Sequence, residues 1–203
     1  MTQLWSNTYS FDTAANNNAA AFRNNNYVFI GSNGIIKVRD LIVNNSIGSV
    51  LDYGCGYSNS LQTYCGNTVT VAKYDAFISD YSTRPANTYD LVVSHLMLHF
   101  AEKDYIPAIV QDICNYSNKM VLLNIIVKSN AQLSNTAPWY NSNTSPKTQV
   151  YFDSITSANL TIVDAKVSTG EERISLAGNT ISNDVITEIR TANVNMLCIL
   201  AKK

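Results

Sequence analysis

The feature that most constrains the fold is a short apolar run that ends in a carboxylate and a glycine turn. The run covers residues 48–53, and Gly54-Cys55-Gly56-Tyr57-Ser58 follows at once. Glycine adopts positive φ angles without steric cost, so this turn allows a strand to pass directly into a helix. The sequence therefore predicts a strand over 48–53, a tight turn, and a helix over 59–64.

The same alternation of strand and helix continues along the chain. Short β-branched or apolar runs predict further strands over 68–74, 89–94, 120–127, 160–167 and 195–201. Apolar residues at helical spacing predict helices over 34–45, 102–116, 149–156 and 181–190. Strands that alternate with helices favour a mostly parallel sheet with helices on both faces, a three-layer α/β fold.

The length and the even composition indicate one domain over residues 1–203. Residues 1–33 are rich in Asn and aromatic side chains, and we expect them to form a lid or cap. Residues 128–148 carry Trp139 and Tyr140 in a polar loop that is too long for a plain connection. We expect this loop on the substrate side, where the two aromatic residues either line a pocket or plug the loop.

The charge balance limits the partners that the protein can have. Charged residues make up 14% of the chain and the net charge is −1, so the sequence lacks the basic excess that nucleic-acid binding requires. No apolar run is long enough to span a membrane, and we expect a cytoplasmic protein. The four scattered cysteines are expected to be reduced thiols, and their spacing disfavours a zinc site. The sequence does not indicate the oligomeric state.

The glycine turn departs from the dinucleotide-binding pattern. That pattern is G-x-G-x-x-G, but Asn59 stands where the third glycine belongs. The sequence has an acid instead, Asp52, two residues before Gly54. An ionised carboxylate at this place is suited to a cation rather than to a pyrophosphate.

The segment Val50-Leu51-Asp52-Tyr53-Gly54-Cys55-Gly56 closely resembles the first motif of the class I S-adenosylmethionine-dependent methyltransferases, in particular the small type 11 and type 12 members. The resemblance implies a Rossmann-like sheet with an antiparallel C-terminal strand and S-adenosylmethionine as cofactor. It also implies that Asp52, Gly54, Cys55 and Gly56 hold the amino-acid portion of the cofactor. Ser58 stands where many members of the family have another glycine.

Two further segments extend this resemblance over residues 48–127. Asp75 follows Asp52 by 23 residues, as expected for the acid that binds the ribose hydroxyls in the family. Residues 89–100 resemble the fourth-strand segment of small methyltransferases, which places Ser94 and His95 at the cofactor. Only 15 residues separate Asp75 from Asp90, so the third strand is expected to be shortened or missing. Ala76 and its neighbours would then form much of the adenine pocket, although Phe77 is equally well explained as a core residue.

His95 and His99 are the histidines of the chain and the candidate catalytic bases. If the chain is helical after the strand, their spacing places both on one face, and an ordinary histidine pKa suits general-base catalysis. The alternative is that His95 packs against the cofactor and His99 fills a local pocket. A third ligand is missing nearby, so we expect no metal site.

The methyl acceptor is expected to be a small molecule or a sugar-like compound. The Asn/Asp-Pro-Pro-aromatic motif of enzymes that methylate exocyclic amino groups is replaced by Ser94-His95-Leu96-Met97, and the Pro-Cys dipeptide of cytosine-C5 enzymes does not occur. Two other interpretations stay open. One is a non-catalytic protein that binds S-adenosylmethionine or serves in assembly, and the other is a nicotinamide-dependent oxidoreductase.

Overall fold

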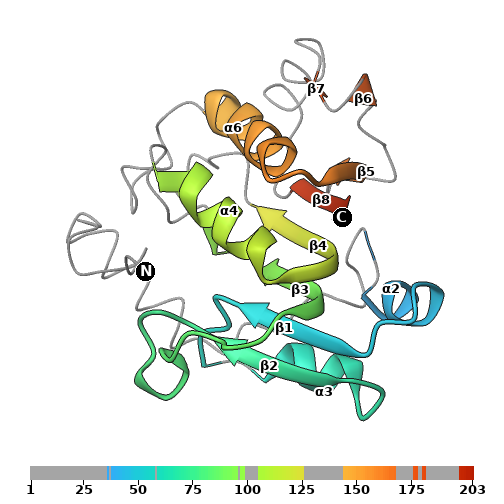
Figure 1. Cartoon of the computed structure of the whole chain (residues 1–203), viewed down its shortest axis with the longest axis vertical. Helices are drawn as coiled ribbons and strands as arrows, with labels where there is room; N and C mark the ends of the chain where they lie inside the picture. The colour runs from blue at the N-terminus through green and yellow to red at the C-terminus, as the bar shows by residue number, and fades with distance from the viewer. Residues whose placement is uncertain are drawn as a thin grey trace.

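The computed structural model describes residues 36, 38–57, 59–95, 97–98, 105–125, 144–167, 176–177, 180–181 and 197–203. Six strands form one sheet in the order β2-β1-β3-β4-β8-β5 (Figure 1). Their bounds are Thr70–Tyr74 (β2), Ser49–Tyr53 (β1), Tyr89–His95 (β3), Ser117–Ile125 (β4), Leu197–Lys202 (β8) and Thr161–Val167 (β5). The strands β2, β1, β3 and β4 pair in parallel, whereas β8 is antiparallel to both of its neighbours. The predicted sheet, mostly parallel with an antiparallel C-terminal strand, is confirmed.

Helices cover both faces of the sheet, which gives the three predicted layers (Figure 1). Among the described residues, the helices α2 (Val38–Asn44) and α3 (Ser60–Cys65) lie on one face, and α4 (Ile106–Asn115) and α6 (Thr144–Ser157) lie on the other. The strand residues alternate between the two resulting cores, because successive side chains of a strand point to opposite faces. Val92 and Leu123 pack on the side of α4 and α6, whereas Val93 and Leu122 pack on the side of α2 and α3.

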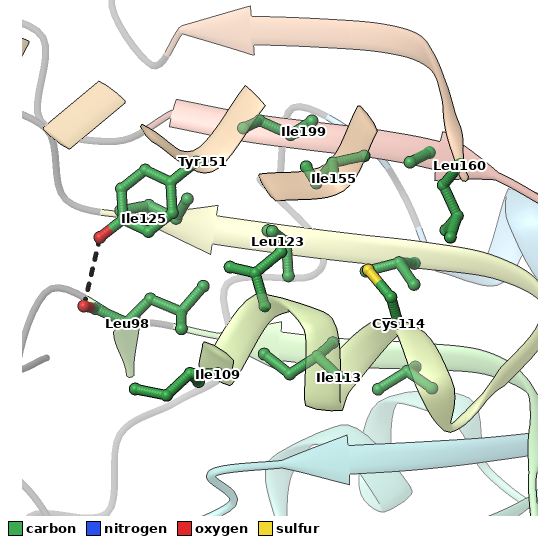
Figure 2. Packing of buried hydrophobic residues seen from close by; sticks show 14 of the residues in the cluster. Leu98, Ile109, Ile113, Cys114, Leu123, Ile125, Tyr151, Ile155, Leu160 and Ile199 are labelled. Carbon is green, nitrogen blue, oxygen red and sulfur yellow. Dashed lines mark hydrogen bonds between the residues drawn. The ribbon is translucent and has the colours of Figure 1, made fainter. Parts of the chain in front are cut away.

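The core between the sheet and the helices α4 and α6 is formed mostly by aliphatic side chains, and Tyr151 on α6 is buried among them (Figure 2). Ile109 and Ile113 on α4 are fully buried, as is Ile155 on α6. The hydroxyl of Tyr151 donates a hydrogen bond of 3.2 Å to the carbonyl of Leu98 (Figure 2). This bond satisfies the buried hydroxyl and ties α6 to the segment that follows β3.

Two sequence predictions need correction. Residues 180–181 form the short strand β7 (Thr180–Ile181), which pairs with β6 (Leu176–Ala177), so the helix predicted from Ile181 does not begin there. Gly178-Asn179 between the two strands is a hairpin signal that outweighs the helical spacing of the following residues. The loop predicted over 128–148 gives way to α6 from Thr144, because Pro146 is tolerated in the first turn of a helix.

Several predictions fall outside the described residues. They concern the lid over 1–33, the aromatic pair Trp139 and Tyr140, and the remainder of the helix predicted over 181–190.

The third strand of the predicted fold is missing between β2 and β3. The structure describes all of residues 75–88. This segment contains the 3-10 turn η1 (Ser79–Tyr81) and no strand. Within the described part of the chain, β2 is therefore an edge of the sheet. The prediction of a shortened third-strand region is confirmed.

A side chain of α3 bonds part of the backbone along this open edge. The backbone N–H of Val71 donates to Oε1 of Gln62 over 3.1 Å, and Nε2 of Gln62 lies 3.5 Å from the carbonyl of Val69. Directly after β2, the N–H of Asp75 donates to the carbonyl of Tyr81 over 3.0 Å. Edge strands present unpaired backbone groups that invite other chains, and these contacts satisfy part of them.

A buried polar network fixes the short connection between β2 and β3 to the helix α4. Asp112 on α4 is buried, accepts a hydrogen bond of 2.7 Å from the hydroxyl of Tyr53, and pairs with Arg84. The guanidinium of Arg84 also lies over the ring of Tyr116, 5.7 Å from its centroid. Asp112 thus connects the end of β1 to the connection that replaces the missing strand.

Removing one hydroxyl from this network is expected to destabilise the protein. Tyr53→Phe keeps the buried ring but deletes a hydrogen bond to a charged acceptor, which contributes about 1.5–3 kcal/mol. We therefore expect a loss of about 2 kcal/mol in the free energy of unfolding, measured by urea denaturation. The matched control is Tyr57→Phe, whose side chain is 52% exposed and should change stability little. Equal effects of the two substitutions would contradict this account of Asp112.

Candidate functional site

The carboxyl ends of four neighbouring parallel strands bring the predicted site residues to one edge of the sheet. Asp52 and the glycine turn end β1, Asp75 follows β2, and His95 is the last residue of β3. Asn124, near the end of β4, is opposite His95 in the pairing of the two strands. Parallel strands of an open α/β sheet typically gather their ligand contacts at this edge.

The glycine turn is tied to the end of β2 by backbone hydrogen bonds. Gly54 and Gly56 have φ angles of 82° and 56°, in the left-handed region that favours glycine. The N–H groups of Gly54 and Cys55 donate to the carbonyl of Tyr74 over 2.7 and 3.2 Å. The turn therefore holds a fixed position beside Asp75.

Asp75 is bonded directly to this turn. Its Oδ2 accepts a hydrogen bond of 2.9 Å from the N–H of Gly56, and its Oδ1 accepts one of 3.0 Å from the N–H of Phe77. The side chain is buried, with 6% of its surface exposed. A carboxylate has about four lone-pair sites, so each oxygen retains the capacity to accept one more donor. The carboxylate is thus oriented by the backbone and able to bind a pair of hydroxyl groups.

Asp52 lies beside this arrangement and is also buried, with 7% of its surface exposed. It is opposite Lys73 in the pairing of β1 with β2. Burial raises the pKa of Asp52 to about 7, with Lys73 lowering it and the charge of Asp75 raising it. A cation bound near the turn would favour the ionised form and compensate for the cost of burial.

Cys55 has no features of a nucleophile in this turn. Its Sγ lies 3.3 Å from the carbonyl of Gly56, and only 7% of the residue is exposed. Burial and the charge of Asp52 raise the pKa of the thiol above its usual range. The thiolate that a nucleophile requires is therefore disfavoured. All four cysteines are buried and free.

Met97 approaches the glycine turn so closely that Gly54 cannot carry a side chain. A Cβ on Gly54 would lie 2.5 Å from Cγ of Met97 and 2.8 Å from its Cβ. The turn and the segment after β3 are therefore packed directly against each other. This contact places Met97 in the site, a residue that the sequence motif contains but that the spacing did not single out.

Gly54→Ala is expected to cost more stability than the same change at Gly66. Both glycines have positive φ angles, 82° and 62°, so both substitutions strain the backbone. A Cβ on Gly66 meets nothing within 4 Å, whereas one on Gly54 collides with Met97. Thermal denaturation of both variants measures the difference, and equal losses would show that the Met97 contact is unimportant.

His95 lies at the end of β3, where Nδ2 of Asn124 is 3.1 Å from its Nδ1. Burial lowers the pKa of His95 to about 4, so the ring is neutral at neutral pH. This differs from the ordinary pKa on which the general-base expectation rested. His95 is also a strand residue, so the helical spacing expected between it and His99 does not begin there, and His99 lies outside the described residues.

Ser94 points to the opposite face of the sheet from His95, because neighbouring side chains of a strand alternate. The residue has no exposed surface, and its Oγ has no hydrogen-bond partner within the part of the chain that the structure describes. Asn124 was not predicted as a site residue. It is the polar residue of the otherwise apolar run 120–125, and that interruption is the signal that could have identified it.

The residues after Asp75 pack against the core. Ile78 is buried, and Ala76 and Phe77 are partly buried against the cluster beneath α4. The interpretation of Phe77 as a packing residue is thus supported, and its N–H also orients Asp75.

Within the described ranges, no three His, Cys, Asp or Glu side chains are arranged to hold a metal ion. No helix among the described residues is long and apolar enough to cross a membrane.

No family model matches the chain, and no curated protein matches it either. Solved structures do match. Plantazolicin methyltransferase BpumL, in complex with a triazolic desmethylPZN analog and SAH, is 13% identical with a TM-score of 0.56, covering 94% of this chain and 90% of that one. Magnesium protoporphyrin IX methyltransferase from Synechocystis PCC 6803, with bound SAM, is 11% identical with a TM-score of 0.52, covering 86% and 80%.

A third match is the methyltransferase domain of bacterial CtHen1-CN, which is 8% identical with a TM-score of 0.51 and coverage of 82% and 95%. The chain thus has the fold of the class I S-adenosylmethionine-dependent methyltransferases over most of its length.

Proposed function

We propose that the protein is an S-adenosylmethionine-dependent methyltransferase that acts on a small-molecule or sugar-like acceptor. The observation that carries the proposal is the bond from the N–H of Gly56 to the carboxylate of Asp75, which joins the glycine turn to the second acid. The fold supports it, because two of the structurally similar methyltransferases contain SAM or SAH.

Each residue of the glycine turn and of the strand ends beside it would have a role suited to its chemistry. Asp75, held by two backbone N–H groups, would accept hydrogen bonds from the two ribose hydroxyls. Asp52 would face the cationic amino group of the cofactor, which matches a carboxylate that is costly to ionise without a counter-charge. Gly54, Cys55 and Gly56 would let the backbone close around the amino-acid portion. Ala76 would border the adenine.

When bound, the cofactor supplies a methyl group on a sulfonium, which an acceptor displaces in line. The chain contributes position and exclusion of water, and these can supply most of the acceleration of such a displacement. Met97 lies against the turn and His95 ends the neighbouring strand β3, and there they would border the methyl group and the acceptor.

The choice of a small acceptor depends on charge and on motifs. A net charge of −1 gives no general attraction for nucleic acid. The segment after Val93 reads Ser94-His95-Leu96-Met97, without the motif typical of enzymes that methylate exocyclic amino groups.

Isothermal titration calorimetry with S-adenosylhomocysteine tests the proposal, with NADH titrated in parallel. We expect saturable binding of S-adenosylhomocysteine and none of NADH. Binding of NADH alone would favour the nicotinamide-dependent oxidoreductase and overturn the proposal. Binding of S-adenosylhomocysteine without methyl transfer to a broad panel of small-molecule and sugar acceptors would favour the non-catalytic alternative.

A further inference from the structure

The contact between Asn124 and His95 sets a constraint on the chemistry of the site. Asn124 is 6% exposed and is flanked in β4 by apolar residues. An amide in such an environment costs free energy unless its polar atoms are bonded. Its Nδ2 meets Nδ1 of His95 at 3.1 Å across the β3–β4 pair, so the two side chains are held in one relative orientation by the sheet.

This contact determines where the imidazole carries its proton. A neutral imidazole has one nitrogen that donates and one that accepts, and the amide nitrogen of asparagine can only donate. With Nδ2 of Asn124 as the donor, Nδ1 of His95 accepts the hydrogen bond and the ring proton is on Nε2. The lowered pKa of His95, about 4, keeps the ring in this neutral form at neutral pH.

We infer that Asn124 is a positioning residue that holds His95 in the Nε2–H tautomer, so that His95 donates a hydrogen bond to an oxygen of the methyl acceptor. This inference rests on the proposed function and deepens it. It also changes the role expected of His95, because a ring whose Nε2 carries the proton cannot remove one from the acceptor through that atom. The acceptor class it implies is a small molecule with an oxygen that accepts a hydrogen bond close to the methylated position.

Nitrogen-15 NMR of histidine-labelled protein tests the tautomer. His99→Gln leaves His95 as the single histidine, and we expect its Nε2 to be protonated and its Nδ1 to be bare. A protonated Nδ1 would overturn the inference. This measurement needs neither cofactor nor acceptor.

Asn124→Asp tests whether residue 124 causes the tautomer. A carboxylate can only accept, so the ring proton should move to Nδ1 and the titration midpoint of His95 should rise by roughly one pH unit or more. Should this variant fail to fold, Asn124→Leu removes the donor and should give a mixture of both tautomers. An unchanged pure Nε2–H tautomer in the variant that folds would contradict the role of Asn124.

Acetate is the probe for the oxygen-donating role. Titrated into the His99→Gln protein saturated with S-adenosylhomocysteine, it should shift the Nε2 signal of His95 in a saturable manner. The shift should be lost in Asn124→Asp, where Nε2 has no proton to donate. Absence of any acetate response would overturn the donor role. If S-adenosylhomocysteine itself does not bind, the proposed function fails while the tautomer assignment stands on its own measurement.

Discussion

Asp75→Ala is expected to weaken S-adenosylhomocysteine binding by roughly 100-fold or more. The substitution deletes an acceptor for two ribose hydroxyls, and each hydrogen bond to a charged group contributes about 1.5–3 kcal/mol. Since about 1.4 kcal/mol corresponds to a factor of ten, the combined loss reaches two orders of magnitude. The variant also releases the N–H groups of Gly56 and Phe77, which loosens the turn itself. Calorimetry measures the dissociation constant.

The control for this experiment is Asp80→Ala, five residues further along the chain. Asp80 is exposed in η1, where its carboxylate accepts a hydrogen bond of 3.3 Å from the hydroxyl of Ser79. The Asp80→Ala substitution removes one carboxylate from the same connection without changing the glycine turn. Asp75→Asn adds a second comparison, because the amide keeps the shape of the side chain but places an NH2 group against a backbone donor. Equal affinities of Asp75→Ala and Asp80→Ala would refute the assignment of the ribose acid.

Asp52→Asn is expected to stabilise the protein without cofactor while weakening its binding of S-adenosylhomocysteine. The pKa of Asp52 is about 7 in the folded protein and 3.8 in its ordinary environment. The unfolded chain thus loses this proton near pH 4, whereas the folded protein keeps it until about pH 7. Stability therefore falls as the pH rises between these values, and the full penalty applies above about pH 7.

The size of this effect follows from the difference between the two pKa values. It amounts to a penalty on the order of 4 kcal/mol at about pH 8, which asparagine does not carry. Thermal denaturation of both proteins should show the variant melting several degrees higher at about pH 8 and only slightly higher at about pH 4. A variant less stable than the unsubstituted protein at about pH 8 would mean that Asp52 is compensated in the fold.

The same titration should appear in cofactor binding. If the ionised carboxylate binds the cationic amino group, affinity for S-adenosylhomocysteine should rise about tenfold between pH 6 and pH 8 and then level off. Asp52→Asn should bind more weakly at pH 8 and lose this dependence on pH. A tenfold rise that persists in the variant would assign the titration to another group.

The predictions from sequence were strongest where a local pattern determines the structure. The acid and the glycine turn after β1 define a strand-to-turn transition within nine residues, and the 23-residue spacing to Asp75 defines the next strand. The short interval between Asp75 and Asp90 was likewise sufficient to predict a missing strand, because 15 residues cannot hold a helix and a strand.

The relationships that the sequence could not supply all depend on contacts between distant residues. Asn124 meets His95 only because β3 and β4 pair in one register, and nothing local defines that register. The burial that lowers the pKa of His95 is likewise a property of the assembled sheet, which is why an ordinary histidine was expected. The error at Ile181 has the opposite cause, since a two-residue hairpin signal lay within a longer helical pattern.

The amide of Gln62 shows how a sheet of this fold can lack its outer strand, because it bonds the backbone at the edge that this strand would otherwise cover. An outer strand normally satisfies the backbone groups of its neighbour, so its loss should leave a chain prone to association. Here one side chain from the crossover helix accepts from Val71 and approaches Val69, in place of backbone from another strand. A sheet of this kind can therefore lose its outer strand through a deletion in one connection, provided that an amide side chain of the preceding helix reaches the backbone of the strand that is left at the edge. The loss of the outer strand alters the connection that begins at Ala76, while Asp75 stays bonded to the glycine turn.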